Sequence, residues 1–321
     1  MILIGRPLRT FAASPASAAA NDWYLPLSRA PASWWEAARD GSDITVYAQD
    51  RATRLPCEIV AFNAAAKTGH LWIGRGTATA AYVECGSGRA AQAVTDPYGR
   101  NAVWEAGALG IWHLADMTDS TGKNTSTSTA EPAYTAANLP KSPALFNGTS
   151  QYINTGCSTD GLTAFTLMVY VNQAAVGDLF AMSSRNSGTT GGLFAFASAS
   201  LMSFGFSNGV HMTYRRYGTA DAGTPTLMFG VHAPGVADVT VYYNGVITPS
   251  SLIASSATNP ANSGAPFILG KDGADTTPYW FKNNLGAVRL YNRALSSTEV
   301  AAIDNNYRNA TTSFWTIGAC F

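Results

Sequence analysis

The chain has little charge. Only 12% of its 321 residues are Asp, Glu, Lys or Arg, and the 20 acidic residues balance the 20 basic ones. A neutral chain without basic runs has no electrostatic attraction for nucleic acid or for an anionic membrane surface. It also lacks any apolar run near the roughly 20 residues that a spanning helix needs. We therefore predict no nucleic-acid partner and no membrane insertion. Because the low charge gives little repulsion between molecules, we expect much of the surface to be covered by partners in an assembly.

Cysteine is scarce, and its spacing argues against a metal centre. The four cysteines, Cys57, Cys85, Cys157 and Cys320, form no CxxC pair and have no histidine close in sequence. Such spacing argues against a zinc site. Cys57 and Cys85 fall in strand-like segments, where a small buried thiol is the simplest interpretation. A disulfide between these two remains an alternative that the sequence leaves open.

Catalytic motifs are also missing. The six glutamates, at positions 36, 58, 84, 105, 131 and 299, do not form an ExDxxE pattern that would place paired carboxylates across a glycosidic bond. The sequence contains no GxSxG elbow and no phosphate-binding loop with its Lys-Ser/Thr ending. His113 lies in the strand-like IWHLAD segment, and we expect it to be structural. The protein is therefore predicted not to be an enzyme.

What the chain does contain is typical of an all-β protein. Aromatic residues make up 11% of it and glycine occurs 30 times, which favours many short strands joined by tight turns. FTLMVYV (165–171) is an uninterrupted apolar strand, as expected inside a sandwich. Asn208-Gly209 and Asn244-Gly245 each predict a hairpin, the first with a type I′ turn.

Two segments carry helix-start signals. Ser33 and Glu36 form a capping-box pattern that predicts a short helix over residues 34–39, ended by Gly41. Ser296 and Glu299 repeat the pattern, after a strand predicted at residues 285–291. The second box predicts one short helix near the C-terminus.

The segments VRLYNRALSSTEV (288–300), GIWHLADMTDSTGKN (110–124), PALFNGTSQYINTG (143–156) and VTVYYNG (239–245) resemble the laminin-G-like family of concanavalin-A-like jelly rolls. Residues 21–105 resemble, in the order of their pieces, a small uncharacterised β-domain that precedes such domains in secreted bacterial and bacteriophage proteins. The matching pieces are residues 42–44, 55–59, 71–73 and 103–104. The resemblance implies two β-sandwich domains, the second a jelly roll with one short C-terminal helix. It places the domains at residues 21–105 and 106–310.

The two ends are predicted to lie outside these domains. Residues 1–20 are expected to form an N-terminal arm rather than a signal peptide, because Arg6, Pro7 and Arg9 interrupt the apolar stretch. A neighbouring molecule or the chain's own first domain would hold this arm. Residues 311–321 form an apolar tail, and burying each of its large side chains would contribute about 1.5–3 kcal/mol. The tail should dock on the first domain or on another subunit.

Two groups of residues combine aromatic rings with polar side chains, as a sugar site requires. The first group contains His211, Tyr214, Arg215, Arg216 and Tyr217. The second contains Asp275, Tyr279, Trp280, Lys282 and Asn283. An inter-subunit contact is the alternative for the first group, and a core-capping role is the alternative for Trp280.

The resemblance also raises the question of a metal, because relatives of this fold often bind calcium through loop carboxylates and carbonyls. Asp119 and Asn124 occupy the matching loop. Gly286 and Ala287, however, stand where many relatives carry an acidic pair. We predict no cofactor and leave calcium open at these two residues.

Together these observations predict a non-enzymatic bacteriophage virion protein of the tail, baseplate or fibre type, which binds host-surface carbohydrate. Its partners would be other virion proteins and further copies of the chain, for which a trimer is one arrangement. It would be made in the host cytoplasm and end up in the virion. The alternatives are a purely structural decoration or cement protein of the virion, and a secreted, extracellular bacterial adhesin that binds glycans.

Overall fold

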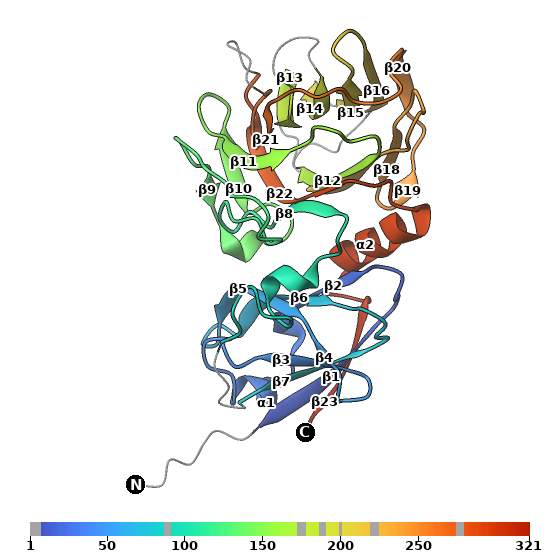
Figure 1. Ribbon diagram of the computed structural model, residues 1–321. Coiled ribbons are helices and arrows are strands. Elements are labelled where there is room, and N and C mark those ends of the chain that lie inside the picture. The colour runs from blue at the N-terminus through green and yellow to red at the C-terminus, as the bar shows by residue number, and fades with distance from the viewer. Residues whose placement is uncertain are drawn as a thin grey trace. The chain divides into compact units, whose positions relative to one another are not determined.

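The computed structural model describes residues 8–86, 91–171, 178–185, 191–198, 201–218, 225–273 and 279–321. The chain forms two compact units (Figure 1): unit 1 contains Met1–Glu105 and Ala301–Phe321, and unit 2 contains Ala106–Val300. Every strand pair is antiparallel, which confirms the all-β prediction. Within the described residues, no helix is long and apolar enough to cross a membrane.

Unit 1 contains two sheets. The larger is built from β1 (Arg9–Pro15), β3 (Thr45–Ala48), β4 (Arg54–Leu55), β7 (Ala81–Cys85) and β23 (Trp315–Cys320). Its strand order is β23-β1-β7-β3-β4. The smaller sheet has the order β2-β6-β5, with β2 at Asp22–Pro26, β5 at Cys57–Asn63 and β6 at Thr68–Gly74.

The described part of the predicted arm and the predicted tail contribute strands to unit 1, which corresponds to the alternative in which the chain's own first domain holds them. Strand β1, inside the predicted arm, lies between β7 and β23, so its backbone groups are paired on both sides. Figure 1 shows the first and last strands side by side. The structure thus divides the chain at residues 105/106 and 300/301, whereas the sequence suggested that the second domain ended at 310.

The apolar tail is buried in its own unit, the first of the two predicted alternatives. Phe314 and Trp315 are 1% and 2% exposed. The indole Nε1 of Trp315 donates to the backbone oxygen of Tyr24 at 2.9 Å, and its ring lies 5.8 Å from that of Trp23. Phe314 and Trp315 of the tail therefore form part of the core of unit 1.

The predicted first helix is shorter than expected and lacks its capping box. Helix α1 covers only Ala32–Trp35, and Pro31 occupies the N-cap position without a side-chain cap. Glu36 instead follows the helix, and its carboxylate lies 3.9 Å from the guanidinium of Arg9. Ser33 is the second residue of this helix, so its hydroxyl does not occupy the N-cap position that the capping box requires.

The C-terminal capping box is confirmed. The Ser296 backbone N–H donates to Glu299 Oε2 at 2.9 Å, and the Glu299 N–H donates to Ser296 Oγ at 3.2 Å. Helix α2 follows over Ser297–Asn309. Three 3₁₀ turns complete the helical elements: η1 (Leu27–Arg29), η2 (Arg100–Val103) and η3 (Ala136–Asn138).

Unit 2 is a sandwich of two large sheets. The eight-stranded sheet contains β8 (Ala108–Trp112), β9 (Ala133–Tyr134), β10 (Ala144–Asn147), β12 (Phe165–Val171), β17 (Thr226–His232), β18 (Thr240–Tyr243), β19 (Val246–Ile247) and β22 (Lys282–Tyr291). Its order is β19-β18-β17-β12-β22-β10-β9, and β8 also pairs with β22.

The seven-stranded sheet contains β11 (Ile153–Ser158), β13 (Asp178–Ser183), β14 (Gly192–Ser198), β15 (Leu201–Ser207), β16 (Met212–Gly218), β20 (Ser251–Ser255) and β21 (Pro266–Leu269). Its order is β11-β21-β13-β14-β15-β16-β20. The inner faces of both sheets form one core, which includes Leu167, Met202, Phe204 and Leu290. The predicted apolar strand at 165–171 is buried along its whole length.

The two Asn-Gly hairpins differ. At the tip of β18–β19, Asn244 and Gly245 have φ values of 51° and 75°, as a type I′ turn requires. The β15–β16 connection is longer, because Ser207 pairs with Met212 and four residues form the loop. There Gly209 has a positive φ, whereas the Asn208 side chain accepts hydrogen bonds from the N–H groups of Val210 and His211. The predicted type I′ turn at this position is wrong.

Candidate functional site

Strand β16 separates the first predicted group onto two faces of its sheet. Tyr217 points inward, packs against the core of unit 2 and lies 5.0 Å from the Tyr243 ring. Arg215, on the same side, donates to both carboxylate oxygens of Asp238 at 2.5 and 2.6 Å. Although burial opposes it, this pairing lowers the pKa of Asp238. Arg215 and Tyr217 therefore serve the sandwich interior.

Tyr214 and Arg216 lie on the outer face of the same sheet. The Tyr214 ring is 6.0 Å from Phe194 and 5.9 Å from Phe196, both on β14, and the Arg216 guanidinium lies 5.9 Å from the Tyr214 ring centre. Gly205 on the intervening β15 makes room, because a Cβ there would lie 2.3 Å from that of Tyr214. We call these four side chains the outer-face cluster: Phe194, Phe196, Tyr214 and Arg216.

A buried ion pair, Arg185 with Asp272, lies beside Phe194 of this cluster. Arg185, just after β13, lies 3.4 Å from a carboxylate oxygen of Asp272 and 5.4 Å from the Phe194 ring centre. Ser183 donates to the other Asp272 oxygen at 2.9 Å. Arg185 is 9% exposed and Asp272 is 2% exposed. The pair is thus a rigid internal support rather than an open binding surface.

The second predicted group contributes Trp280 to a cluster at the rim of the sandwich, where the chain passes from β21 to β22. The Trp280 ring lies 6.0 Å from the Tyr152 ring, and the planes are tilted by 55°. The ammonium of Lys271 lies 4.5 Å from the Tyr152 ring centre and 5.5 Å from that of Trp280. All three side chains are partly exposed. We call Tyr152, Lys271 and Trp280 the rim cluster.

Local backbone structure positions the rim cluster. Gly270 has a φ of +92°, and a Cβ at this position would lie 2.4 Å from the buried Phe146 ring. Only glycine fits there without a shift, and it turns the chain so that Lys271 forms a bridge with Trp280. Phe281, directly after Trp280, is buried in the core and anchors the other side of the bridge.

Other residues of the two groups are not among the three side chains of the rim cluster. Tyr279 is 51% exposed, and its backbone oxygen accepts a hydrogen bond from Asp272. Asn283 pairs with Phe146 in the sheet, and its side chain accepts from the N–H of Asn284. His211 lies exposed in the β15–β16 loop, and Lys282 lies exposed at the start of β22. Asp275 lies outside the described residues.

Sequence reasoning missed Tyr152 and Lys271. Tyr152 precedes β11 and Lys271 follows β21, so their meeting depends on the pairing of Ile153 with Leu269. Two features of the sequence could have indicated the contact. The spacing of apolar residues marks β11 and β21 as strands, and Tyr152 and Lys271 lie at the ends of these strands that pair. That pairing is not local in sequence, which is why Trp280 was found without its partners.

The calcium candidate Asp119 has a different role in the structure. Its Oδ1 accepts from the N–H groups of Ile111 and Thr121, and its Oδ2 accepts from the Thr121 hydroxyl and from two Asn124 donors. The side chain is 3% exposed. Five donors already surround the carboxylate, and Asn124 donates to it rather than facing a cation. These residues fix the loop after β8.

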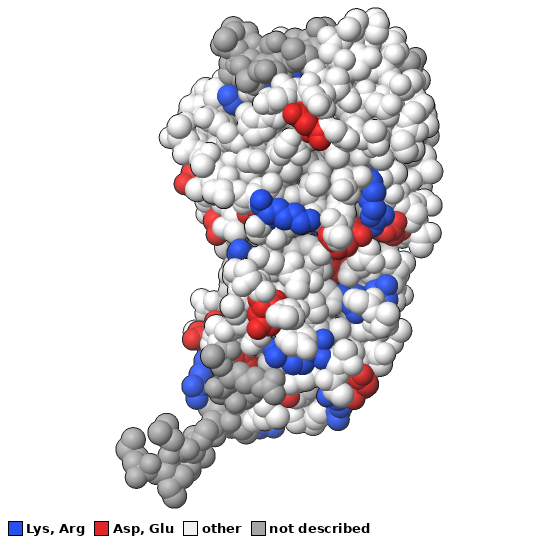
Figure 2. Space-filling view, in the orientation of Figure 1, with Lys and Arg blue, Asp and Glu red and all other residues white. Residues whose placement is uncertain are grey.

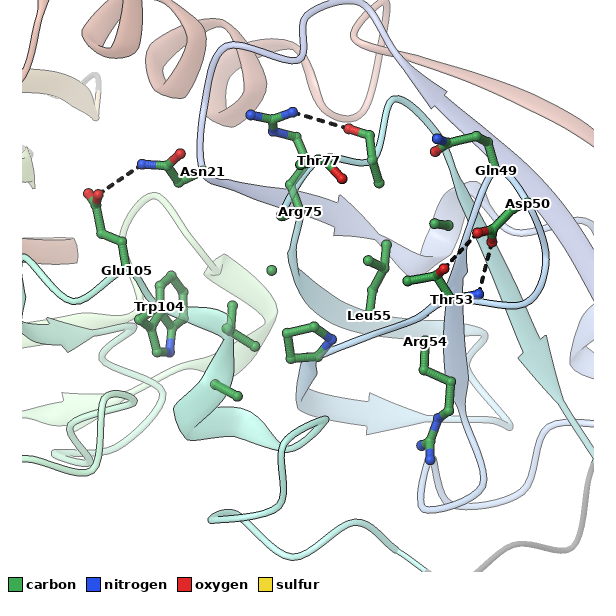
Figure 3. Close-up of a pocket in the computed structure, with 17 residues that line it drawn as sticks. Asn21, Gln49, Asp50, Thr53, Arg54, Leu55, Arg75, Thr77, Trp104 and Glu105 are labelled. Atoms are coloured by element: carbon green, nitrogen blue, oxygen red, sulfur yellow. Dashed lines mark hydrogen bonds between the residues drawn. The ribbon is translucent and has the colours of Figure 1, made fainter.

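Unit 1 contains a cavity of about 590 Å³, between β3, β6 and the segment around Trp104 (Figure 3). Its polar lining is largely engaged within the protein. Asn21 donates to Glu105 at 2.8 Å, and Arg75 donates to the backbone oxygens of Ala20 and Ala78. The Thr53 hydroxyl donates to Asp50, which lowers the pKa of that carboxyl. The cavity is large enough for a small ligand, but its charged groups already have partners.

The four cysteines form no disulfide among the described residues. All four cysteines are free, which excludes the Cys57–Cys85 disulfide in this structure. Burial raises the pKa of the Cys57 and Cys157 thiols to about 12. Both thiols are therefore protonated and unreactive near neutral pH.

Charge is sparse on the visible face of unit 2, where uncharged atoms dominate (Figure 2). This fits the 12% of charged residues in the chain.

Comparison with known proteins identifies the fold of unit 2. Residues 147–301 match the family described as the concanavalin A-like lectin/glucanases superfamily, which confirms the jelly-roll prediction for this part of the chain. No curated protein matches the chain.

Solved structures with similar folds come from several kinds of protein. The receptor binding domain of a botulinum neurotoxin C/D mosaic serotype has 5% identity and a TM-score of 0.46, with 62% of this chain and 51% of that one covered. Trypanosoma rangeli sialidase has 16% identity and a TM-score of 0.46, covering 64% and 34%. Domain 4 of AbnA, an arabinanase from Geobacillus stearothermophilus bound to arabinotriose, has 18% identity and a TM-score of 0.46, covering 63% and 100%. The chain thus spans about half of the neurotoxin domain and about a third of the sialidase.

Proposed function

We propose that unit 2 binds carbohydrate at the rim cluster. The observation that carries the proposal is the pair of partly exposed rings, Tyr152 and Trp280, 6.0 Å apart with the Lys271 ammonium over both. The apolar face of a sugar ring packs against an aromatic ring, while nearby polar groups bind its hydroxyls. The match of residues 147–301 to a superfamily of lectins and glucanases supports this reading.

We further propose that the chain is a non-enzymatic bacteriophage virion protein that binds host-surface glycan, as the sequence resemblance implies. Other virion proteins and further copies of the chain would be its partners. Asp272 is buried against Arg185 and Asp119 holds its own loop, so we expect neither carboxylate to act as a catalytic acid or base. We expect no release of reducing sugar from any polysaccharide that the protein binds.

The test is binding of the full-length protein to host-type cells and to their extracted surface polysaccharide. Trp280→Ala removes one of the two aromatic rings of the rim cluster and should lower the affinity at least about tenfold, the loss expected when one buried aromatic contact of about 1.5–3 kcal/mol is removed. Phe321→Ala is the matched control, since it deletes an aromatic that is 54% exposed in unit 1. Equal losses in both variants would contradict a site at the rim.

A structural virion component is the second candidate. Its support is the same sequence resemblance, which includes proteins of virions as well as binding modules. If the folded protein binds neither cells nor polysaccharide but assembles with other virion proteins, the structural role replaces the binding role. Particles that incorporate the Trp280→Ala variant and keep normal infectivity would also support the structural role.

A further inference from the structure

Lys271 is a cation whose ammonium rests on two aromatic rings and pairs with no carboxylate among the described residues. Its sequence neighbour Asp272 is an acid. That carboxylate is held by Arg185 at 3.4 Å and by Ser183 at 2.9 Å, and it is 2% exposed. The Arg185 charge offsets the Asp272 charge, so the positive charge of Lys271 is available at the rim.

The rings also fix the position of this charge. A free lysine side chain loses rotamer entropy when it binds a partner. Contacts with Tyr152 and Trp280 already restrict Lys271, and Gly270 fixes the backbone that carries it. The ammonium is therefore pre-organised above a surface suited to a sugar ring, which reduces the entropic cost of binding an anion there.

We infer that the rim cluster selects sugars that carry a carboxylate, such as uronic or sialic acids. This inference rests on the proposed function and specifies its ligand class. The sugar ring packs against Trp280, and its carboxylate accepts a charge-assisted hydrogen bond from Lys271. A neutral sugar of the same shape keeps the ring contact but lacks a partner for the ammonium.

The experiment compares each acidic polymer with its own neutral form. Polygalacturonate and a polymer of N-acetylneuraminic acid are titrated into the full-length protein, before and after chemical reduction of their carboxyl groups. At least one acidic polymer should bind about tenfold more tightly than its reduced form, since a hydrogen bond to a charged group is worth about 1.5–3 kcal/mol. The difference should shrink as salt is raised, because the charges are partly exposed.

Variants test whether Lys271 is the source of this selectivity. Lys271→Gln should bind the acidic and the reduced polymers equally, and Lys271→Arg should keep the preference for the acidic form. Lys282→Gln is the matched control, because it removes the same charge from an exposed residue of the same sandwich. Thermal unfolding of all three variants checks that each remains folded.

The outcomes separate the two proposals. Equal binding of acidic and reduced polymers by the unchanged protein overturns the inference and leaves the carbohydrate site in place. A preference that survives in Lys271→Gln also overturns it, since another cation must then be responsible. Binding of no polymer in either form counts against the inference and the proposed function together.

Discussion

Asp119 organises the loop after β8 through five hydrogen bonds to one carboxylate. Asp119→Ala leaves three buried donors without an acceptor, the N–H groups of Ile111 and Thr121 and the Thr121 hydroxyl, and each such loss costs about 1–3 kcal/mol. We expect unit 2 to lose at least about 3 kcal/mol of unfolding free energy, measured by urea titration. Asp116→Ala, at an exposed neighbouring position, should change little.

Removal of metal ions tests the same residue in another way. The five donors occupy the Asp119 oxygens that a calcium ion would need. Addition of a chelator should therefore leave the melting temperature unchanged. A shift of several degrees upward when calcium is restored would mean that the loop rearranges around a cation.

His232 is a buried base in the core of unit 2. It is 0% exposed, lies 4.3 Å from the Phe206 ring, and its Nδ1 is 2.9 Å from the backbone oxygen of Asp238. Burial lowers the pKa of His232 below its usual 6.5, although the contacts with Asp238 oppose this effect. The neighbouring charges, Asp238 and Arg215, are paired with each other.

The sign of the pH effect follows from that depressed pKa. The unfolded chain binds a proton at His232 more readily than the folded protein, so stability is greatest above pH 6.5 and falls as the pH drops below that value. Denaturant midpoints measured between pH 8 and 5 should show this decline. In His232→Gln it should be reduced, whereas His211→Gln, at an exposed loop residue, serves as the control.

Helix α2 begins at a capping box whose two reciprocal hydrogen bonds are both present. Glu299 also pairs with Arg293 at 2.7 Å, which ties the helix start to the end of β22. Ser296→Ala should lower the unfolding free energy by about 1 kcal/mol. Ser297→Ala, one residue later and also exposed, keeps the cap and should be nearly neutral.

Strand β23 contributes Trp315 to the core of unit 1, with its indole N–H bonded to Tyr24. Trp315→Ala should destabilise the unit by about 3–5 kcal/mol through the cavity that it leaves. Thr316→Ala, on the exposed side of the same strand, should cost well under 1 kcal/mol. Similar effects of both substitutions in urea unfolding would show that the strand is not packed as described.

Elements with local signals were predictable from the sequence, and elements that depend on distant partners were not. The Ser296–Glu299 box and the Asn244-Gly245 turn are complete within a few residues, so their patterns fixed their structures. The Ser33–Glu36 pattern was misleading, because Pro31 determines where α1 begins.

The candidate site follows the same rule. Trp280 was predicted as a candidate sugar-site aromatic, but Tyr152 lies far away in sequence, and both Tyr152 and Lys271 meet Trp280 through strand pairing. Arg215 was grouped with Tyr214 because they are adjacent, yet adjacent residues of a strand face opposite sides. Arg215 binds Asp238, whereas Tyr214 packs against Phe194.

At the scale of the whole molecule, unit 1 is assembled from both ends of the chain. A chain that ends at Asn309 lacks β23, Phe314 and Trp315, so unit 1 should unfold while unit 2 keeps its structure. Tryptophan fluorescence measures this well, because five of the seven tryptophans that remain in the shortened chain lie in unit 1, at positions 23, 34, 35, 72 and 104. Loss of unit 2 signals in the same sample, such as near-ultraviolet dichroism of its tyrosines, would contradict the prediction.

The neighbouring positions of β1 and β23 also set an order of events during synthesis. The ribosome makes β1 before unit 2 and β23 after it, so one edge of β1 stays without its partner until β23 has been synthesised. Unit 2 is fully delivered in the meantime and can reach its own fold first. The final strand then closes unit 1, and a nascent chain cut short anywhere before it carries an open sheet edge that aggregation or proteolysis can exploit.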